Sequence, residues 1–230
     1  AFQGFGDQWN FALEHLPISS KWTMKLDPDE RLSDELKTEV ADAILKDDCD
    51  GCSLIRRLWF MGKPLPIKQS LVRIWRTGQC RFTDVAVNEH PIVSGKIKAV
   101  SGFLEHLDSP DLPHWYHKQN KYTTAEALMR FRGDELADVP SLFGTSFQRR
   151  MWVKANFFRF PFRYSVLFLY HYFYLGAWRA GRVGYIWAKL RVDVFSAIEY
   201  KWREMKFTER EPLEVSSVAG LPDSRVTQYD

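Results

Sequence analysis

The spacing of apolar residues changes abruptly near the N-terminus, and this change most constrains the fold. Residues 21–26 (KWTMKL) alternate between polar and apolar side chains, a pattern typical of a strand. Pro28 ends that pattern because it has no N–H to donate to a neighbouring strand. Ser33 is suited to cap a helix, and from Leu36 onward apolar residues recur every fourth position. A strand, an acidic loop and a helix in this order predict an α/β protein.

The flanking segments extend this mixed pattern. Residues 7–16 and 111–136 are predicted to be helices, and residues 53–90 form a β segment rich in hairpins. We therefore expect a first domain at residues 1–145. Three turns are predicted in and after the β segment: Gly62-Lys63, Thr77-Gly78 and Ser94-Gly95-Lys96.

Residues 147–207 have a different composition, with twelve Lys or Arg residues against three acidic ones and many aromatic residues between them. The longest uncharged run, from Tyr164 to Trp178, has fifteen residues, fewer than the ~20 that a membrane-spanning helix needs. Basic, aromatic helices can lie in the plane of a membrane interface. We therefore expect a helical membrane-binding region at residues 146–207 and a disordered tail at 208–230. Two alternatives stay open: the aromatic residues pack as core, or they stack on single-stranded nucleic acid.

Charge and cysteine content narrow the class of protein. The net charge of +3 is too small to indicate a nucleic-acid partner, and we expect none. Three cysteines do not make a disulfide framework and favour a reducing compartment. Cys49 and Cys52 have CxxC spacing, but a zinc site needs four ligands and Cys80 supplies only one more. We therefore expect an ordinary loop around Cys49 and Cys52.

Asp27 and Asp29 follow the predicted strand directly. Alternate residues of an extended segment point the same way, so these two carboxylates are expected to converge on one cation. Mg²⁺ and Mn²⁺ prefer oxygen ligands and are commonly held by one or two carboxylates together with substrate phosphates. Ligands of open α/β sheets bind at the carboxyl ends of the strands. The alternative is a polar turn that leads into the helix.

A series of short motifs runs through most of the chain in a fixed order. They resemble motifs of the family 2 glycosyltransferases of the GT-A fold, in particular those of lipopolysaccharide-core and exopolysaccharide synthesis. The resemblance covers residues 2–207 and implies an α/β fold: the C-terminal portion of a GT-A, Rossmann-like sheet domain, followed by the helical region. The matching segments are residues 4–13, 22–32, 73–76, 87–90, 105–106, 118–126 and 175–201.

The chain departs from the family pattern in three places. Asn88 stands where the family has His, and Ala180-Gly181 stands where it has Asp-Gly. The family begins with strands that hold the nucleotide base, and these strands have no counterpart in this sequence. We therefore expect an N-terminally truncated transferase that keeps the metal, catalytic and acceptor parts.

The resemblance assigns roles to individual residues. Glu89 stands at the position of the base that takes the proton from the acceptor hydroxyl in inverting transfer. Asp27, Asp29 and His106 stand where a Mg²⁺ or Mn²⁺ ion would be held, although a lone His is more often structural. Substrate-binding positions are matched by Asn10, Arg73, Arg76, Lys118, Asn120 and Tyr122.

Arg73 and Arg76 need a further distinction, because both match substrate-binding positions. They lie three residues apart on a predicted strand and therefore face opposite sides of the sheet. The forked donors of an arginine suit a phosphate group. We expect at most one of the two to bind phosphate and the other to form a surface ion pair.

The resemblance also implies partners. These are a nucleotide-sugar donor, a lipid-linked saccharide acceptor and a membrane surface, with the chain placed peripherally at the cytoplasmic face of the inner (plasma) membrane. A protein of another class fits the sequence too: a non-catalytic protein that binds membrane surfaces, as a degenerate remnant of the family. Metal-dependent nucleotide binding separates these two hypotheses.

Overall fold

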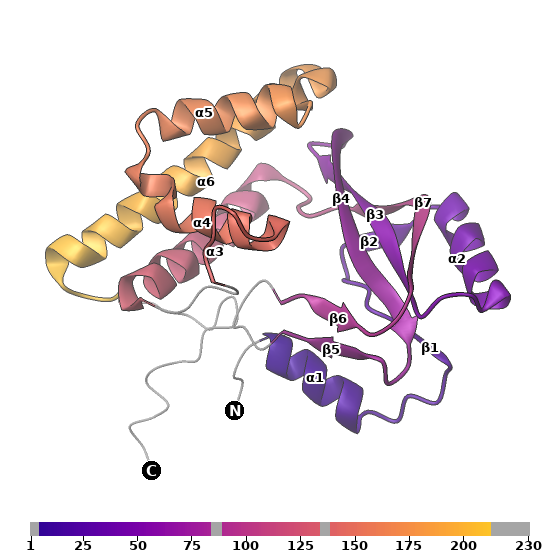
Figure 1. Cartoon of the computed structure of the whole chain (residues 1–230). Coiled ribbons are helices and arrows are strands. Elements are labelled where there is room, and N and C mark those ends of the chain that lie inside the picture. Colours follow the sequence, from indigo (N-terminus) through magenta and orange to yellow (C-terminus); the bar gives the residue numbers. More distant parts are fainter. Residues whose placement is uncertain (1–4, 84–88, 134–138, 213–230) are drawn as a thin grey trace, which may run out of the picture.

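The structure is a computed structural model that describes residues 5–83, 89–133 and 139–212. Within these residues, a sheet domain lies beside a group of helices (Figure 1), which is the mixed α/β architecture that the sequence predicts. The predicted strand at 21–26 and the predicted helices at 7–16 and 111–136 are confirmed in shortened or slightly shifted form. In chain order, the elements are α1 (Phe5–His15), β1 (Trp22–Met24), β2 (Glu30–Leu32), α2 (Asp34–Lys46), β3 (Gly51–Phe60), β4 (Lys63–Arg76), β5 (Cys80–Phe82), β6 (Pro91–Val93), β7 (Ile97–His106), α3 (Leu112–Arg132), α4 (Ser146–Asn156), η1 (Phe157–Arg159), α5 (Arg163–Leu169), η2 (Tyr170–Tyr174), η3 (Ala177–Ala180) and α6 (Gly181–Thr208).

The main sheet has the strand order β1-β4-β3-β7-β2. Strands β3 and β7 are parallel, and the other neighbouring pairs of this sheet are antiparallel. Strands β5 and β6 form a second, two-stranded sheet. This arrangement is compatible with the expected GT-A sheet, and the assignment to that fold stays a prediction.

The long hairpin of β3 and β4 confirms that this segment is rich in β structure. The two residues between the strands, Met61 and Gly62, have positive φ angles of 48° and 71°. Two successive positive φ angles are typical of a type I′ turn, whose twist suits a two-residue hairpin loop. The turn lies one residue earlier than the predicted Gly62-Lys63. The turns predicted at Gly78 and Gly95 are confirmed, and both glycines have positive φ.

Helix α2 packs on the sheet from the start that the sequence predicts. Ser33 is the N-cap, and its side-chain oxygen accepts a hydrogen bond from the N–H of Leu36 at 3.2 Å. Leu36, Leu54 and Leu104 are fully buried in one apolar cluster between α2 and the sheet. Gly102 of β7 allows the close approach, because a Cβ atom there would lie 2.5 Å from the Leu36 backbone.

A second apolar cluster joins the helices to the hairpin. Phe60 at the end of β3 packs in it with Trp115 of α3 and Trp187 of α6. Helix α6 lies between α3 and α5 (Figure 1). This cluster contains residues from both sides of the domain boundary predicted at 145/146, and that boundary stays a prediction. Of the predicted tail, residues 213–230 lie outside the described residues.

Among the described residues, no helix is both long enough and apolar enough to cross a membrane.

The loop expected around Cys49 and Cys52 ends where β3 begins. Strand β3 contains Cys52, and the thiols of Cys49 and Cys52 are both buried. Burial and the neighbouring Cys49 raise the pKa of Cys52 to about 12, and burial raises the pKa of Cys80 to about 12. Cys52 and Cys80 are therefore protonated and unreactive at neutral pH.

Candidate active site

Strand pairing brings Asp29 beside His106. Glu30 of β2 is paired with His106 of β7, so Asp29, one residue earlier, lies next to the end of β7. The N–H of Leu107 donates a hydrogen bond to the carbonyl of Asp29 at 2.8 Å. The imidazole Nε2 of His106 lies 3.3 Å from Oδ2 of Asp29. The sheet therefore brings together two of the residues predicted to hold a metal.

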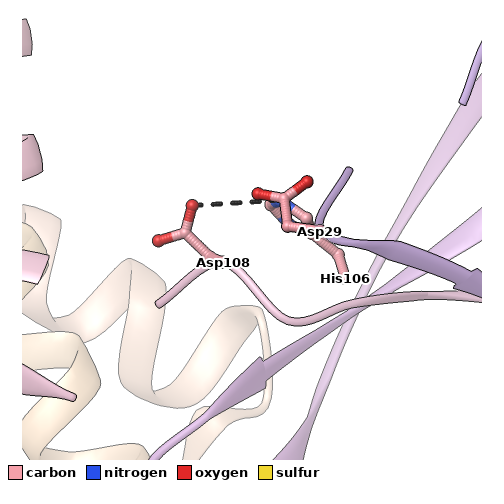
Figure 2. A group of neighbouring side chains, drawn as sticks. All are labelled: Asp29, His106 and Asp108. Carbon is pink, nitrogen blue, oxygen red and sulfur yellow. Dashed lines mark ion pairs between the residues drawn. The ribbon is translucent and has the colours of Figure 1, made fainter. Parts of the chain in front are cut away.

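Asp108 completes a group of three. It follows β7 by two residues and points toward Asp29 and His106 (Figure 2), with its Oδ1 3.8 Å from Nε2 of His106. One donor atom from each of the three residues lies within 4.8 Å of the others. Two carboxylates suit Mg²⁺ or Mn²⁺, and the imidazole favours a first-row transition metal such as Mn²⁺. The donor set therefore fits a divalent cation.

Lys118 of α3 places an ammonium group beside these carboxylates. Its Nζ lies 2.7 Å from Oδ1 of Asp108 and 3.6 Å from Oδ2 of Asp29. A hydrogen bond from His106, opposed by burial and aided by the charge of Lys118, lowers the pKa of Asp29 to about 2. Burial works against the charge of Lys118, but its ion pairs with Asp108 and Asp29 raise its pKa. Asp29 is therefore ionised at neutral pH, and the ammonium group balances part of the negative charge.

Asp27 lies apart from this group because the chain does not stay extended. It turns at Pro28 and Asp29, and the N–H of Glu30 donates to the carbonyl of Asp27 at 3.0 Å. Oδ2 of Asp27 instead accepts a hydrogen bond from Arg73 at 2.9 Å. The expectation that Asp27 and Asp29 lie in an extended segment and point the same way was therefore wrong. The role of Asp27 as a metal ligand stays a prediction.

The fully buried side chain of Glu30 holds this turn in place. Its Oε1 accepts a hydrogen bond from Arg73 at 2.6 Å and lies 3.7 Å from Nη1 of Arg56. Its Oε2 accepts a hydrogen bond from the N–H of Asp27 at 3.1 Å. A buried carboxylate requires such partners, because an unpaired buried charge is strongly unfavourable. Arg73, predicted to bind substrate, thus binds two carboxylates of the protein in this structure.

Glu89 lies at the other end of the same charged network. Its Oε1 is 3.0 Å from Nζ of Lys25, and that ammonium group is 4.0 Å from Oδ1 of Asp27. The Glu89 side chain is 12% exposed, so it is largely shielded from water. Val87 and Asn88, which belong to the same motif, lie outside the described residues. Lys25 therefore links Glu89 to the acidic turn, and the role of Glu89 as a base stays a prediction.

Arg76 has partners of its own. Its guanidinium lies 2.8 Å from Oδ1 of Asp47 and 3.1 Å from Oδ1 of Asp50. Arg73 and Arg76 therefore contact different acidic groups, as expected for residues that face opposite sides of a strand. Whether either one binds substrate phosphate stays a prediction.

The three remaining predicted substrate-binding residues lie on helices. Asn10 of α1 exchanges two hydrogen bonds with the backbone of Phe82, at 2.7 and 3.0 Å. Asn120 of α3 accepts hydrogen bonds from Lys201 through its carbonyl and its side chain, at 2.8 and 2.7 Å. Tyr122 of α3 is exposed. Asn10 and Asn120 thus connect elements of the fold, and the predicted binding roles of all three stay predictions.

Asp108 and Lys25 contact predicted site residues but were not assigned from the sequence. Asp108 lies two residues after His106, and Lys25 lies two residues before Asp27. Side chains two apart in an extended segment point to the same side, so this spacing was a usable signal for both. A spacing of two residues predicts that two side chains are neighbours only where the segment is extended.

No protein-family profile matches the chain. The chain is 26% identical over 192 residues to "Lipopolysaccharide core biosynthesis glycosyltransferase LpsC" of Rhizobium meliloti (strain 1021). The similar region covers 80% of this chain and 64% of that protein, so the chain spans less than two thirds of the relative's length. This similarity supports a relationship to the glycosyltransferases.

Proposed function

We propose that the chain carries the metal and catalytic part of an inverting glycosyltransferase of the GT-A fold. The donor would be a nucleotide sugar and the acceptor a lipid-linked saccharide, in the synthesis of a cell-surface polysaccharide. The observation that carries this proposal is the group of Asp29, His106 and Asp108 with Lys118 beside it. The similarity to a lipopolysaccharide-core glycosyltransferase supports the same reaction class.

Asp29, His106 and Asp108 would hold the Mg²⁺ or Mn²⁺ ion. Such an ion offsets the charge that develops on a departing diphosphate. The ammonium group of Lys118 already contacts both carboxylates, so it lies where the phosphate oxygens of a donor would approach. Lys118 would donate hydrogen bonds to those oxygens and so orient the leaving group.

Glu89 would be the general base. Its carboxylate would take the proton of the acceptor hydroxyl as the acceptor oxygen bonds to the anomeric carbon and the bond to the diphosphate breaks. Lys25 orients this carboxylate through the 3.0 Å ion pair. The acceptor would therefore approach from the Glu89 side of the network and the diphosphate from the Lys118 side.

The location is also a proposal: the chain would act peripherally at the cytoplasmic face of the inner (plasma) membrane, where a lipid-linked acceptor is within reach. The rival hypothesis is a non-catalytic protein that binds the membrane surface. The two differ in the metal site, because only the transferase requires a bound divalent cation.

The proposal is tested by titrating Mn²⁺ alone into the chain by calorimetry, with Asp29→Asn and Asp108→Asn as variants. We expect each variant to weaken Mn²⁺ binding by at least about tenfold, because each loses one charged ligand. Asp34→Asn is the matched control, since that carboxylate is exposed on α2 and forms an ion pair with Lys37, which is not one of the proposed metal-site residues. Thermal unfolding without metal shows whether each variant is folded. Equal Mn²⁺ affinity of the chain and Asp29→Asn, or no binding by either, would rule out the metal site and favour the rival.

A further inference from the structure

One outer face of the helical segment formed by α5 and η2 is apolar and exposed. Its side chains recur at intervals of three and four residues, so they lie on one side of the helical segment. Phe162 is 81% exposed and Tyr174 is 79% exposed. We call this exposed surface the aromatic stripe; its members are Val166, Leu169, Tyr170, Phe173 and Tyr174 of the helical segment, together with Phe162 directly before α5.

The opposite face of the same segment is firmly packed. Phe168 and Tyr172 pack on the apolar cluster that contains Trp187 of α6. The buried ring of His171 meets the Trp187 ring edge-on, with centroids 5.1 Å apart. The aromatic stripe is therefore exposed on a well-anchored element, and α6, which supplies much of this core, is not part of it.

The start of α5 is anchored by ion pairs. Arg163 donates to both carboxylate oxygens of Glu199 of α6, at 2.7 to 2.9 Å, and Tyr164 donates to the same carboxylate at 2.5 Å. Phe162, directly before α5, has a left-handed backbone with φ of 53°. A bulky residue rarely adopts this conformation because it is strained. The strained backbone presents the Phe162 ring to solvent.

The part of the sequence that contains the aromatic stripe carries charge of one sign. Residues 139–192 contain nine Lys or Arg residues and no Asp or Glu. Arg159, Arg179 and Arg182 are exposed. Within the described part of the chain, Arg179 and Arg182 form no ion pair, so their charge is available to a partner. A surface of this kind matches a partner that is apolar inside and anionic outside.

We propose that the aromatic stripe docks on a bilayer that contains anionic lipid, with α5 and η2 lying in the plane of the interface. Phe and Leu side chains would enter the acyl boundary, Tyr rings would lie at headgroup depth, and the arginines would contact lipid phosphates. This inference deepens the proposed function, since it rests on that function for the lipid-linked acceptor it would bring within reach. The docking itself depends on the stripe and the exposed arginines and not on the transferase reaction.

The experiment is flotation of the full chain with vesicles of phosphatidylcholine mixed with phosphatidylglycerol. We expect binding to these vesicles and little binding to phosphatidylcholine alone. The double variant Phe173→Ser, Tyr174→Ser should bind roughly tenfold or more weakly, because two large apolar groups no longer leave water. The matched control is Tyr200→Ser with Phe207→Ser, which changes two exposed aromatic residues of α6 outside the stripe and should bind as the parent does. Arg179→Gln with Arg182→Gln should remove most of the preference for anionic vesicles.

The proposal is overturned if the Phe173, Tyr174 double variant binds vesicles as tightly as the parent. It is also overturned if the chain ignores vesicles but self-associates through the stripe, since a second copy would then be the occupant. Mn²⁺ titration of the same variants separates this result from the proposed function. Vesicle binding by Asp29→Asn should equal that of the parent, and Mn²⁺ binding by the stripe variant should be unchanged.

Discussion

Two buried glutamates, one in the sheet and one in the helices, are held in different ways. Glu30 is completely buried, and its partner Arg73 has a side chain that is only 7% exposed. Glu199 is almost as buried, at 2% exposed, but its partners Arg163 and Arg203 are 23% and 48% exposed. Solvent therefore screens the ion pairs of Glu199 more than it screens the pair of Glu30 with Arg73.

Each glutamate positions one of the two surfaces proposed to function. Glu30 fixes the turn that carries Asp29, and Glu199 fixes the start of α5, directly after Phe162. In the sheet, the anchoring charges hold the turn that carries Asp29, since Glu30 follows Asp29 directly in the chain. In the helices, they lie beneath an apolar face. Removing Glu30 or Glu199 should therefore lower the free energy of unfolding by different amounts. Loss of Glu30 should affect metal binding, and loss of Glu199 should affect vesicle binding.

The largest effect is expected for Glu30→Ala. It leaves the buried guanidinium of Arg73 with Asp27 as its remaining carboxylate partner, and breaking a buried pair costs about 3–5 kcal/mol of the free energy of unfolding. Urea denaturation measures this loss, with Glu35→Ala, an exposed position of α2, as the control. If the free energy of unfolding falls no more than in the control, water or a rearranged side chain stabilises the charge of Arg73 in place of Glu30.

Glu199→Ala is expected to cost less, about 1–3 kcal/mol, because its arginine partners are partly solvated. If Glu199 positions the aromatic stripe, the variant should also bind anionic vesicles more weakly while its Mn²⁺ affinity stays unchanged. A variant that is destabilised but docks normally would show that α5 keeps its place without this anchor.

The acid range probes the candidate metal group. The pKa of Asp29 is lowered to about 2 in the folded chain, below its ordinary value of 3.8. Its ionised form therefore stabilises the fold above about pH 4, and that contribution is lost as the pH falls toward about 2. Because the group is partly solvated, we expect about 1 kcal/mol. Urea denaturation at a series of pH values from neutral to acid measures this contribution, which should be absent in Asp29→Asn. If the variant has the same pH dependence of the free energy of unfolding as the parent, Asp29 is not the source of this contribution.

Arg76→Gln should have the smallest effect. Its ion pairs with Asp47 and Asp50 lie near the surface, where solvent screens them, so we expect a smaller loss in the free energy of unfolding than for the other variants. Mn²⁺ affinity should match that of the parent, because Arg76 contacts none of the three proposed ligands. A clear loss of Mn²⁺ binding would connect this end of β4 to the metal group.

Local patterns in the sequence were good predictors of the elements. Ser33 marked the start of α2 and glycines marked the turns, because capping and positive φ depend on a few neighbouring residues. The site was predicted less completely. Asp29 and His106 were identified by resemblance, but the turn at Pro28 sends the Asp27 carboxylate to Arg73. That outcome depends on buried ion pairs between distant strands, which local spacing does not specify.

The aromatic residues of the region 146–207 show the same difference between what local sequence predicts and what the tertiary structure decides. Its composition predicted a surface helix, and the alternative of a packed core is also partly true, since Trp187 and Ala177 are buried while Phe173 and Tyr174 are exposed. Only the arrangement of α5 on α6 separates the two sets. Composition therefore predicted that this region is helical and aromatic. The packing of α5 on α6 determines which of its aromatic residues are exposed.

The pairing of β2 with β7 has a consequence for how the chain folds. Asp29 and His106 are far apart in the sequence, and they meet only once this non-local pairing has formed. Contacts of large sequence separation form slowly, because the entropy of closing the intervening loop is lost first. A metal ion bound at Asp29, His106 and Asp108 would therefore recognise the folded chain and not its early intermediates. Its binding would shift the folding equilibrium by mass action, making metal uptake a reporter of the completed sheet.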